Sequence, residues 1–310
     1  MRAATTNSAR PRVGIDAVLV IDKPVGPTSF DVVRKVRRAA GVRRVGHGGT
    51  LDPAASGVLP ICLGEATKLA QFLLDADKQY DFTVCFGVET DTDDAAGTVT
   101  ARHDAGAIDE AAVRGALEAF RGPITQVPPR YSALKRDGRA LYDYARAGQV
   151  VEPAPREVVV HELTLRSFAG PEAVAFTMRC SKGTYVRALA RDLGRALGVG
   201  AHVTTLRRTR SGPFSLAEAR PLDAALAALA AGDPAALGLI DLADALRHLE
   251  RRVVADPIAR DVRLGRKIRL EGSEPMGYRR LCLVDGAGKL VAVAQLREGG
   301  ALELLRVFGV

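Results

Sequence analysis

Residues 46–60 read Gly-His-Gly-Gly-Thr-Leu-Asp-Pro-Ala-Ala-Ser-Gly-Val-Leu-Pro, a glycine-rich segment that presents a single carboxylate, Asp52. Glycine allows backbone conformations and close approaches that a Cβ atom would forbid. Pro53 fixes its own φ angle and disfavours the α conformation at Asp52. Loops on a rigid scaffold often carry reactive groups, although Asp-Pro and Gly-Gly also occur in ordinary turns. The segment is therefore a candidate catalytic loop with Asp52 as its acid, and a hydrophilic turn is the alternative.

The composition is that of a basic globular protein. Of the 310 residues, 47% are hydrophobic, 5% are aromatic and none is tryptophan, so aliphatic side chains must dominate the core. The formal net charge of +8 and the isoelectric point near 9.6 indicate a polyanionic partner, either a nucleic acid or an acidic membrane surface. No apolar run approaches the ~20 residues of a membrane-spanning helix. We therefore expect a nucleic-acid partner and no membrane association.

The four cysteines are far apart in the chain and form no Cys-x-x-Cys pair. This spacing argues against a zinc site and a disulfide framework, and it favours reduced, buried thiols in a cytoplasmic protein. Residues 1–12 contain three arginines and no acidic residue, without the apolar core of a signal peptide. A transit peptide has a similar composition, but we interpret this segment as a disordered tail close to RNA.

An amphipathic helix is predicted shortly before the glycine-rich segment. Residues 17–21 form an apolar run typical of a buried strand, and Thr28 and Asp31 then resemble a capping box. Apolar residues follow at helical spacing up to Gly41, a typical helix end. The opposite face and its extension are basic: Arg34, Lys35, Arg37, Arg38, Arg43 and Arg44. We expect the last four of these to meet RNA phosphates, because this face leads into the candidate catalytic loop; a solvated helix surface is the alternative.

The remaining pattern predicts an α+β fold. Alternating polar and apolar residues indicate a half-buried strand over 80–86, and two further strands are predicted at 158–168 and 174–180. Apolar residues at helical spacing predict an amphipathic helix over 186–197. Strand runs with a few helices between them, and without regular βαβ alternation, favour a mixed β-sheet with flanking helices.

Three parts of the chain differ in composition. We assign residues 1–12 to the tail, 13–248 to the main α+β domain and 249–310 to a small C-terminal domain. Residues 216–247 are rich in alanine and leucine and predict helical packing at the edge of the main domain. Short strands separated by glycine-containing turns predict a small C-terminal β-barrel; they lie at 281–284, 290–295 and 302–308.

Two other motif interpretations fail. Asp91, Asp93 and Asp94 invite comparison with a calcium-binding loop, but the sixth position of such a loop is Ala96 rather than glycine, and no glutamate stands at the twelfth. The glycine-rich segment lacks the Gly-Lys-Ser/Thr ending of a phosphate-binding P-loop. We therefore predict neither a metal site nor a nucleotide site.

The glycine-rich segment resembles the catalytic signature of the TruB family of tRNA pseudouridine synthases, with Asp52 at the position of the catalytic aspartate. Further blocks match the family in the same order along residues 16–215: IDKP (21–24), GPTSF (26–30), LGEATK (63–68), DKQY (77–80), TDTD (90–93), PPRYSALK (128–135), GTYVR (183–187) and LRRTR (206–210). Gly48 and Ser56 depart from the pattern, since many family members carry threonine there. Neither departure removes the aspartate or a charge.

The resemblance implies a fold and a reaction. The fold is a pseudouridine synthase catalytic domain with a thumb insertion, followed by a PUA-like RNA-binding barrel. The reaction is the isomerisation of uridine 55 in the TΨC loop of tRNA, which needs neither cofactor nor metal. The base leaves its stack, the N1–C1′ bond breaks, and C5 is joined to C1′. Asp52 acts either as a nucleophile at C1′ or as a base at C2′, and the sequence leaves both routes open.

The resemblance also assigns roles to other residues. Tyr80 stacks beneath the flipped uracil, and Arg187 pairs with Asp52 and keeps it ionised and oriented. His47 stacks on bases or binds a phosphate when the uridine leaves its stack. Three further residues are assigned to substrate binding: Tyr185 and Leu206 line the uracil pocket, and Lys23 supports the loop or contacts phosphate. The pattern alone favours core positions for Tyr80, Tyr185 and Leu206, and only the family resemblance reverses that interpretation.

The expected partner is the T arm of tRNA, over which a thumb-like insertion carrying Lys135 and Arg136 would close. We expect a cytoplasmic monomer with no obligatory protein partner. Two alternatives remain: a related synthase with another RNA target, such as one within a guide-RNA complex, and an RNA-binding chaperone for tRNA folding.

Overall fold

The main body is a mixed β-sheet, seen in a computed structural model that describes residues 14–132, 134–136, 138–141, 144, 147, 149, 151–269 and 279–309. Within these residues the sheet has ten strands, in the order β14-β1-β3-β12-β4-β11-β10-β7, with β2 added to β3 and β13 to β12. The β1–β14 and β3–β12 pairs are parallel and the others are antiparallel. Its strands are β1 (Ala17–Lys23), β2 (Val45–His47), β3 (Ala55–Leu63), β4 (Lys78–Phe86), β7 (Gly122–Gln126), β10 (Arg156–Phe168), β11 (Val174–Cys180), β12 (Ala201–Ser211), β13 (Phe214–Ser215) and β14 (Arg220–Pro221). The predicted α+β class with a mixed sheet is confirmed.

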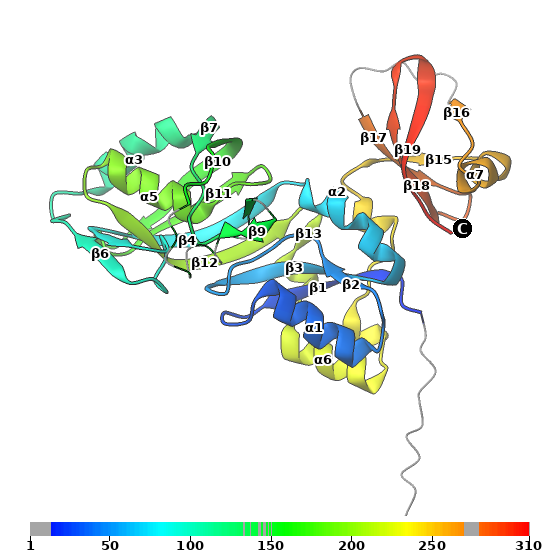
Figure 1. The fold of residues 1–310 in the computed structure, drawn as a ribbon, viewed down its shortest axis with the longest axis horizontal. Coiled ribbons are helices and arrows are strands. Elements are labelled where there is room, and N and C mark those ends of the chain that lie inside the picture. The colour runs from blue at the N-terminus through cyan, green and yellow to red at the C-terminus, as the bar shows by residue number, and fades with distance from the viewer. Residues whose placement is uncertain are drawn as a thin grey trace, which may run out of the picture.

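Two pairs of helices cover one face of this sheet (Figure 1). Helix α1 (Ser29–Ala40) packs on α6 (Leu222–Ala231) near β1 and β3, and α3 (Glu110–Leu117) packs on α5 (Val186–Ala196) near β10 and β12. One continuous apolar core joins all four helices to the sheet. The short pieces α2 (Ala70–Leu74), β5 (Val88–Thr90), β6 (Val99–Arg102), β8 (Lys135–Arg136) and β9 (Arg139–Ala140) connect the larger elements.

Helix α1 begins and ends where the sequence predicts. The hydroxyl of Thr28 accepts a hydrogen bond from the Asp31 backbone N–H at 3.0 Å, and the Asp31 carboxylate accepts one from the Thr28 N–H at 3.0 Å. This reciprocal capping box satisfies two N–H groups that the helix itself leaves without partners. Gly41 ends the helix with φ 64°, a left-handed conformation that glycine adopts at little cost.

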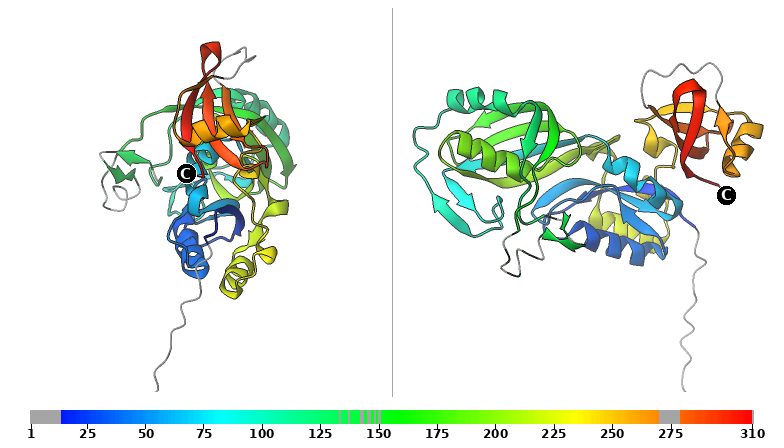
Figure 2. Two further views of the ribbon diagram at one scale, coloured as in Figure 1. Left: turned by 90° about the vertical axis from the view of Figure 1, so that its right-hand side faces the viewer. Right: turned by 45° about the horizontal axis from the view of Figure 1, so that its top comes forward.

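The C-terminal residues form a second, curled sheet of five strands in the order β15-β17-β18-β19-β16. Its elements are β15 (Glu250–Val253), α7 (Asp256–Arg263), β16 (Ile268–Arg269), β17 (Arg279–Val284), β18 (Leu290–Leu296) and β19 (Ala301–Val307). The three predicted strands correspond to β17, β18 and β19. Figure 2 shows the sheet curled with α7 beside it, and Ala259 and Val262 of α7 share a buried core with β17, β18 and β19, in agreement with the predicted PUA-like barrel.

This second sheet is not separated from the first by solvent. Side chains of β1 alternate between two cores: Leu19 and Ile21 face the helices, whereas Val18 and Val20 face the opposite side. On that opposite side they share a buried cluster with Phe72 of α2 and with residues of the C-terminal sheet such as Cys282, Val284 and Leu290. The division at residue 248 falls between the strands of the two sheets and remains a proposal.

Residues 1–12, assigned to the tail, lie outside the described residues. Among the residues that the structure does describe, no helix combines the length and the apolar character that a bilayer crossing requires. All four cysteines are free thiols, and three of them are buried: Cys62, Cys180 and Cys282.

Candidate active site

Residues 48–54 of the glycine-rich segment form the loop between β2 and β3, and its last six residues belong to β3 itself. The loop is fastened at several points. The Ser29 hydroxyl donates to the Leu51 carbonyl at 3.0 Å and accepts from the Leu51 N–H at 2.8 Å. The Gly26 N–H donates to the Pro53 carbonyl at 2.8 Å. Since Leu51 and Pro53 are the two neighbours of Asp52, these bonds fix the backbone on both sides of the candidate catalytic acid.

A buried arginine supports the same loop from below. Arg208 on β12 is almost fully buried, and its guanidinium donates to three carbonyl oxygens: Val58 at 2.8 Å, Thr50 at 3.0 Å and Gly49 at 3.1 Å. Such a planar group satisfies several acceptors in fixed directions. The sequence alone does not reveal this role of Arg208, although the residue lies in one of the blocks that carry the family resemblance.

The main chain of Arg208 also explains a glycine. Gly57 on β3 has φ 106°, and a Cβ atom there would lie 2.1 Å from the Arg208 carbonyl oxygen. A side chain is therefore excluded, which allows the parallel strands β3 and β12 to approach each other closely beneath the loop.

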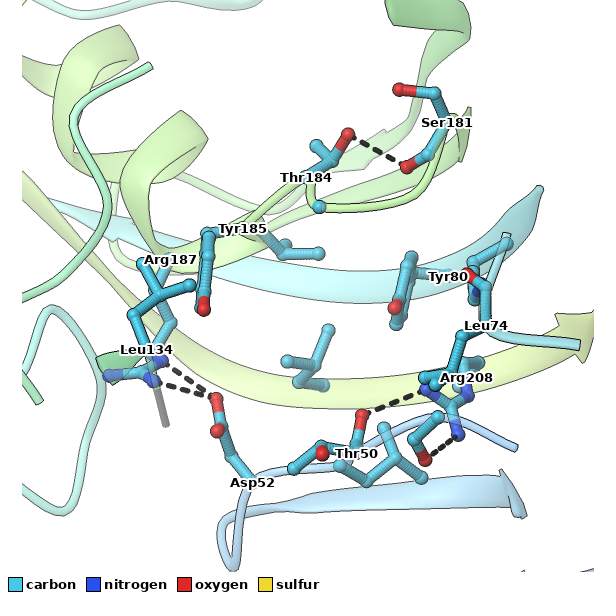
Figure 3. A pocket seen from close by; sticks show the side chains of 16 residues that line it. Thr50, Asp52, Leu74, Tyr80, Leu134, Ser181, Thr184, Tyr185, Arg187 and Arg208 are labelled. Atoms are coloured by element: carbon cyan, nitrogen blue, oxygen red, sulfur yellow. Dashed lines mark hydrogen bonds and ion pairs between the residues drawn. The ribbon is translucent and has the colours of Figure 1, made fainter. Parts of the chain in front are cut away.

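Asp52 and Arg187 form the central ion pair of the site, as Figure 3 shows. Arg187 lies at the start of α5, 135 residues after Asp52, and both its Nε (2.9 Å) and its Nη2 (2.8 Å) contact Oδ2 of the carboxylate. The Arg187 side chain is only 4% exposed, whereas that of Asp52 is 32% exposed. Among the described residues, no hydrogen bond reaches the other carboxylate oxygen, Oδ1. Arg187 thus orients Asp52 through one oxygen and leaves the other without a hydrogen bond from the described residues.

Arg187 is itself held by groups on two other segments. Its Nη1 donates to the Thr92 carbonyl at 2.7 Å, and its Nη2 donates to the Tyr131 carbonyl at 3.0 Å. The buried Asp94 carboxylate lies 3.6 Å from Nε. These partners fix the guanidinium before any substrate is present.

The loop 91–94, which resembles a calcium site in sequence, instead supports this arginine. Oδ1 of Asp94 accepts from the Thr92 hydroxyl at 2.7 Å and from the Ala96 N–H at 3.0 Å, which closes a tight turn. Asp93 has φ 60° and its carboxylate pairs with Arg191 at 3.1 Å. Within the described residues, no group of three or more His, Cys, Asp or Glu side chains is arranged to hold a metal ion. The acidic motif therefore signals a structural turn.

A cavity of about 310 Å³ opens above the ion pair. It is lined by Gly49, Thr50, Leu51, Asp52, Leu74, Lys78, Tyr80, Leu134, Ser181, Gly183, Thr184, Tyr185, Val186, Arg187, Leu206 and Arg208. Its volume lies at the small end of the range for ligand sites. The sequence-predicted residues Asp52, Tyr80, Tyr185, Arg187 and Leu206 therefore meet in one place.

Tyr80 and Tyr185 stand on opposite sides of this cavity, with their hydroxyl ends toward the loop that carries Thr50 and Asp52 (Figure 3). Burial raises the pKa of both phenols above the usual value, so both stay protonated at neutral pH. The side-chain amide of Gln126 fixes the backbone of Tyr185 by accepting from its N–H at 3.0 Å and donating to its carbonyl at 3.2 Å. The cavity walls are thus two aromatic rings in set positions.

Two lysines near the site are buried cations. Lys23 has no exposed surface, and its ammonium donates to the carbonyls of Pro24 and Pro27, both at 2.9 Å. Burial lowers the pKa of Lys23 to about 8, against the opposing effect of Asp52. Burial, and then the positive charge of Arg208, also lower the pKa of Lys78 to about 8. Of the two predicted roles for Lys23, these contacts favour support of the turn beside the loop; Lys23 does not line the cavity.

His47 ends β2, just outside the cavity lining. Its Nδ1 accepts a long hydrogen bond from the Gly49 N–H at 3.4 Å. Burial, and then the positive charge of Arg208, lower the pKa of His47, so the ring is neutral at pH 7. A neutral ring can stack on bases, and the predicted role of His47 in base flipping remains a proposal.

The predicted phosphate-binding residues lie on and after α1. Arg37, Arg38, Arg43 and Arg44 are all exposed, and Arg44 forms an ion pair with Glu65. The two predicted thumb residues, Lys135 and Arg136, make up β8. The structure describes their backbone but not their side chains. Their contact with RNA remains a prediction.

Comparison with known proteins links this chain to one family. A family model described as TruB family pseudouridylate synthase (N terminal domain) matches residues 37–186, and one described as tRNA pseudouridylate synthase B C-terminal domain matches residues 187–253. A Burkholderia mallei protein named tRNA pseudouridine synthase B is 56% identical over 71% of this chain and 71% of its own length. An Aromatoleum aromaticum protein of the same name is 45% identical over 94% of this chain and 92% of its own length.

Solved structures agree at the level of the fold. The chain is similar to one in the crystal structure of a Cbf5-Nop10-Gar1 complex, with a TM-score of 0.75 and 28% identity over 94% of this chain and 85% of that one. It is also similar to a chain in an archaeal box H/ACA sRNP Nop10-Cbf5 complex, with a TM-score of 0.73 and 25% identity over 97% and 89% of the two chains.

Proposed function

We propose that this chain, which belongs to the TruB family of pseudouridine synthases, converts uridine 55 in the TΨC loop of tRNA to pseudouridine. Membership in the family makes it an isomerase. The relatives named tRNA pseudouridine synthase B support tRNA as the RNA that it modifies. The position within tRNA and the chemical route are our proposals.

The observation that carries the proposal is that Arg187 binds only one of the two carboxylate oxygens of Asp52. Arg187 holds Oδ2, and Oδ1 is available at the edge of a cavity walled by Tyr80 and Tyr185. A uridine whose base enters this cavity brings its ribose to the carboxylate. Oδ1 can then attack C1′ as a nucleophile or remove the proton from C2′. Both routes break the N1–C1′ bond, and both stay open.

The cavity suits a uracil that has left its stack. Extruding a base costs a few kcal/mol, which stacking on an aromatic ring offsets. We assign Tyr80 as the ring beneath the uracil, with Tyr185 and Leu206 completing the walls. After the uracil turns, C5 bonds to C1′; on the nucleophilic route the Asp52–C1′ bond breaks as this bond forms, and on the other route Asp52 returns the proton to C2′. The C5 proton is then released, and N1 gains a proton. Substrate and product differ by no electron and no added group, so the proposal includes no cofactor and no metal.

Mapping of pseudouridine tests the proposal. Purified protein and an unmodified T-arm RNA should yield pseudouridine at the position equivalent to 55 and at no other uridine. Deletion of the gene should remove that modification alone from cellular tRNA. Pseudouridine at another position, or in another class of RNA, would overturn the assigned site while leaving the isomerase chemistry intact.

The same experiment separates the two alternatives. The similar chains of known structure occur in complexes with Nop10, and one also with Gar1. We propose instead that this chain acts as a monomer in the cytoplasm without a protein partner or guide RNA, so the purified protein alone must suffice. A chaperone for tRNA folding would alter tRNA structure without forming pseudouridine, and it would not need Asp52.

A further inference from the structure

The cavity wall is connected to the C-terminal sheet by three charged side chains, Lys182, Asp75 and Arg280, which we call the Asp75 bridge. Oδ1 of Asp75 accepts from the Lys182 ammonium at 2.7 Å, and Oδ2 accepts from Arg280 Nη1 at 2.7 Å. Lys182 lies 107 residues from Asp75 along the chain, and Arg280 lies 205 residues from it. One carboxylate therefore joins three segments that are remote in sequence.

At one end of the bridge lies the cavity itself. Lys182 stands in the turn after β11, and its neighbours Ser181 and Gly183 both line the cavity. Asp75 is the C-cap of α2, and the preceding residue, Leu74, also lines the cavity. Lys182 and Asp75 do not line the cavity themselves, but each is adjacent in the chain to residues that do.

At the other end, Arg280 lies near the start of β17 in the C-terminal sheet. Besides Asp75, its guanidinium contacts the ring of Phe72, with 5.8 Å between the guanidinium carbon and the ring centroid. Phe72 is buried in the core that the two sheets share. A planar cation that binds both a carboxylate and an aromatic face fixes β17 against α2 in one orientation.

The Asp75 bridge contributes little to the folding stability of the protein. The side chains of Lys182, Arg280 and Asp75 are 62%, 40% and 30% exposed, and ion pairs this exposed contribute little to folding. Burial alone would raise the pKa of Asp75, but hydrogen bonds from Lys182 and Arg280 lower it below its usual value, so the carboxylate is ionised at neutral pH. What the three residues share is their location between the cavity and the C-terminal sheet.

We propose that Asp75 is a positioning residue, through which the C-terminal sheet holds the 181–184 turn in the geometry needed for isomerisation. This inference rests on the proposed function, since it assigns Asp75 a part in the same reaction. The competing explanation is that Lys182 and Arg280 bind RNA phosphates and Asp75 is merely near them. The two explanations predict different results when the Asp75 charge is removed. On an RNA-binding surface, the loss of an acid should strengthen tRNA binding. In a positioning role, it should slow the chemistry.

Three variants of the full-length chain test this, each assayed for single-turnover rate and tRNA affinity. We expect Asp75→Asn and Arg280→Gln each to lower the rate at saturating tRNA about tenfold, since misplaced walls lower reactivity. The double variant should be no slower than either single one, because the residues act as one unit. Arg279→Gln is the matched control, because Arg279 precedes Arg280 on β17 and its guanidinium pairs with Glu250 of the same sheet at 3.5 Å. It should keep the wild-type rate.

A second readout does not depend on activity. Hydrogen exchange of the backbone over 181–185 should become faster in Asp75→Asn and Arg280→Gln and stay unchanged in Arg279→Gln. Should Asp75→Asn fail to fold, Lys182→Gln, which alters the most exposed member, replaces it in both assays. Wild-type rates with unchanged exchange, or an effect confined to tRNA affinity, would overturn the bridge. Faster exchange in a protein whose wild type forms no pseudouridine would uphold the bridge and refute the proposed function instead.

Discussion

Replacing Arg187 by lysine changes the geometry of the ion pair while keeping its charge. The guanidinium contacts Asp52 with two nitrogens and at the same time donates to the carbonyls of Thr92 and Tyr131. A lysine ammonium is a single point of charge and cannot reach these three partners together. Asp52 would then keep a positive neighbour but lose its fixed orientation.

The expected decrease in rate follows from these interactions. Removing one preorganised polar interaction from an active site typically costs ~10²–10³ in kcat, or ~3–4 kcal/mol of transition-state stabilisation, and we expect Arg187→Lys to fall in this range. Each carbonyl left without a donor costs a further ~1 kcal/mol of folding stability. Affinity for tRNA should stay within a few-fold, because the charge is retained and the side chain is only 4% exposed.

Tritium release from tRNA labelled at uridine C5 measures turnover, filter binding measures affinity, and thermal unfolding measures stability. Arg195→Lys on the same helix is the control, since its side chain is 62% exposed, and it should behave as wild type. An Asp52→Asn/Arg187→Lys double variant should be little slower than Asp52→Asn alone, because groups that act as a unit are not additive. Wild-type turnover in Arg187→Lys would show that orientation of Asp52 is unimportant, and the interpretation of the ion pair would be wrong.

Three other perturbations have expected outcomes. Gly57→Ala should destabilise the fold by at least ~3 kcal/mol in urea unfolding, because its Cβ would lie 2.1 Å from a backbone oxygen, whereas Gly115→Ala in α3, with nothing within 4 Å, should be neutral or stabilising. The pKa of Lys78 is about 8 in the folded protein and 10.5 in the reference state, so the unfolded chain binds more protons between these values. As pH increases from 8 to 10, the unfolding free energy of wild type should therefore rise relative to that of Lys78→Met, by on the order of 3 kcal/mol at most. If the difference between the two proteins does not change with pH, the Lys78 amine is exposed to water and its pKa is not lowered. Charge reversal of Arg37 and Arg38 should reduce the slope of log K against log[salt] by ~0.7–0.9 for each phosphate that is no longer neutralised. An unchanged slope would show that this face of α1 is a solvated surface that does not contact RNA.

Local patterns in the sequence predicted the elements whose formation is local. The capping box at Thr28, the left-handed Gly41 and the alternation along β4 each depend on a few neighbouring residues, and the structure contains them as expected. Helix α7 was not predicted, although Ile258, Ala259 and Val262 lie at helical spacing, because eight residues are too few to show a helical period; β16 was not predicted because two residues carry no period.

The active site depends on contacts that no local pattern encodes. Asp52 and Arg187 are 135 residues apart, and from the sequence only the family resemblance predicts that they form a pair. The loop support by Arg208 arises from the parallel pairing of β3 with β12, which periodicity cannot predict. Likewise, Asp94 was considered only as a metal ligand, because its contact with Arg187 requires the fold.

The most direct test of the account is the substitution Asp52→Asn, which keeps the shape of the side chain and removes its charge. Single-turnover formation of pseudouridine should fall below detection in tRNA, while tRNA affinity stays within several-fold of wild type, because the chemistry needs a carboxylate and the binding surface does not. Substantial pseudouridine formation by Asp52→Asn would contradict the account, since another group would then have to break the glycosidic bond.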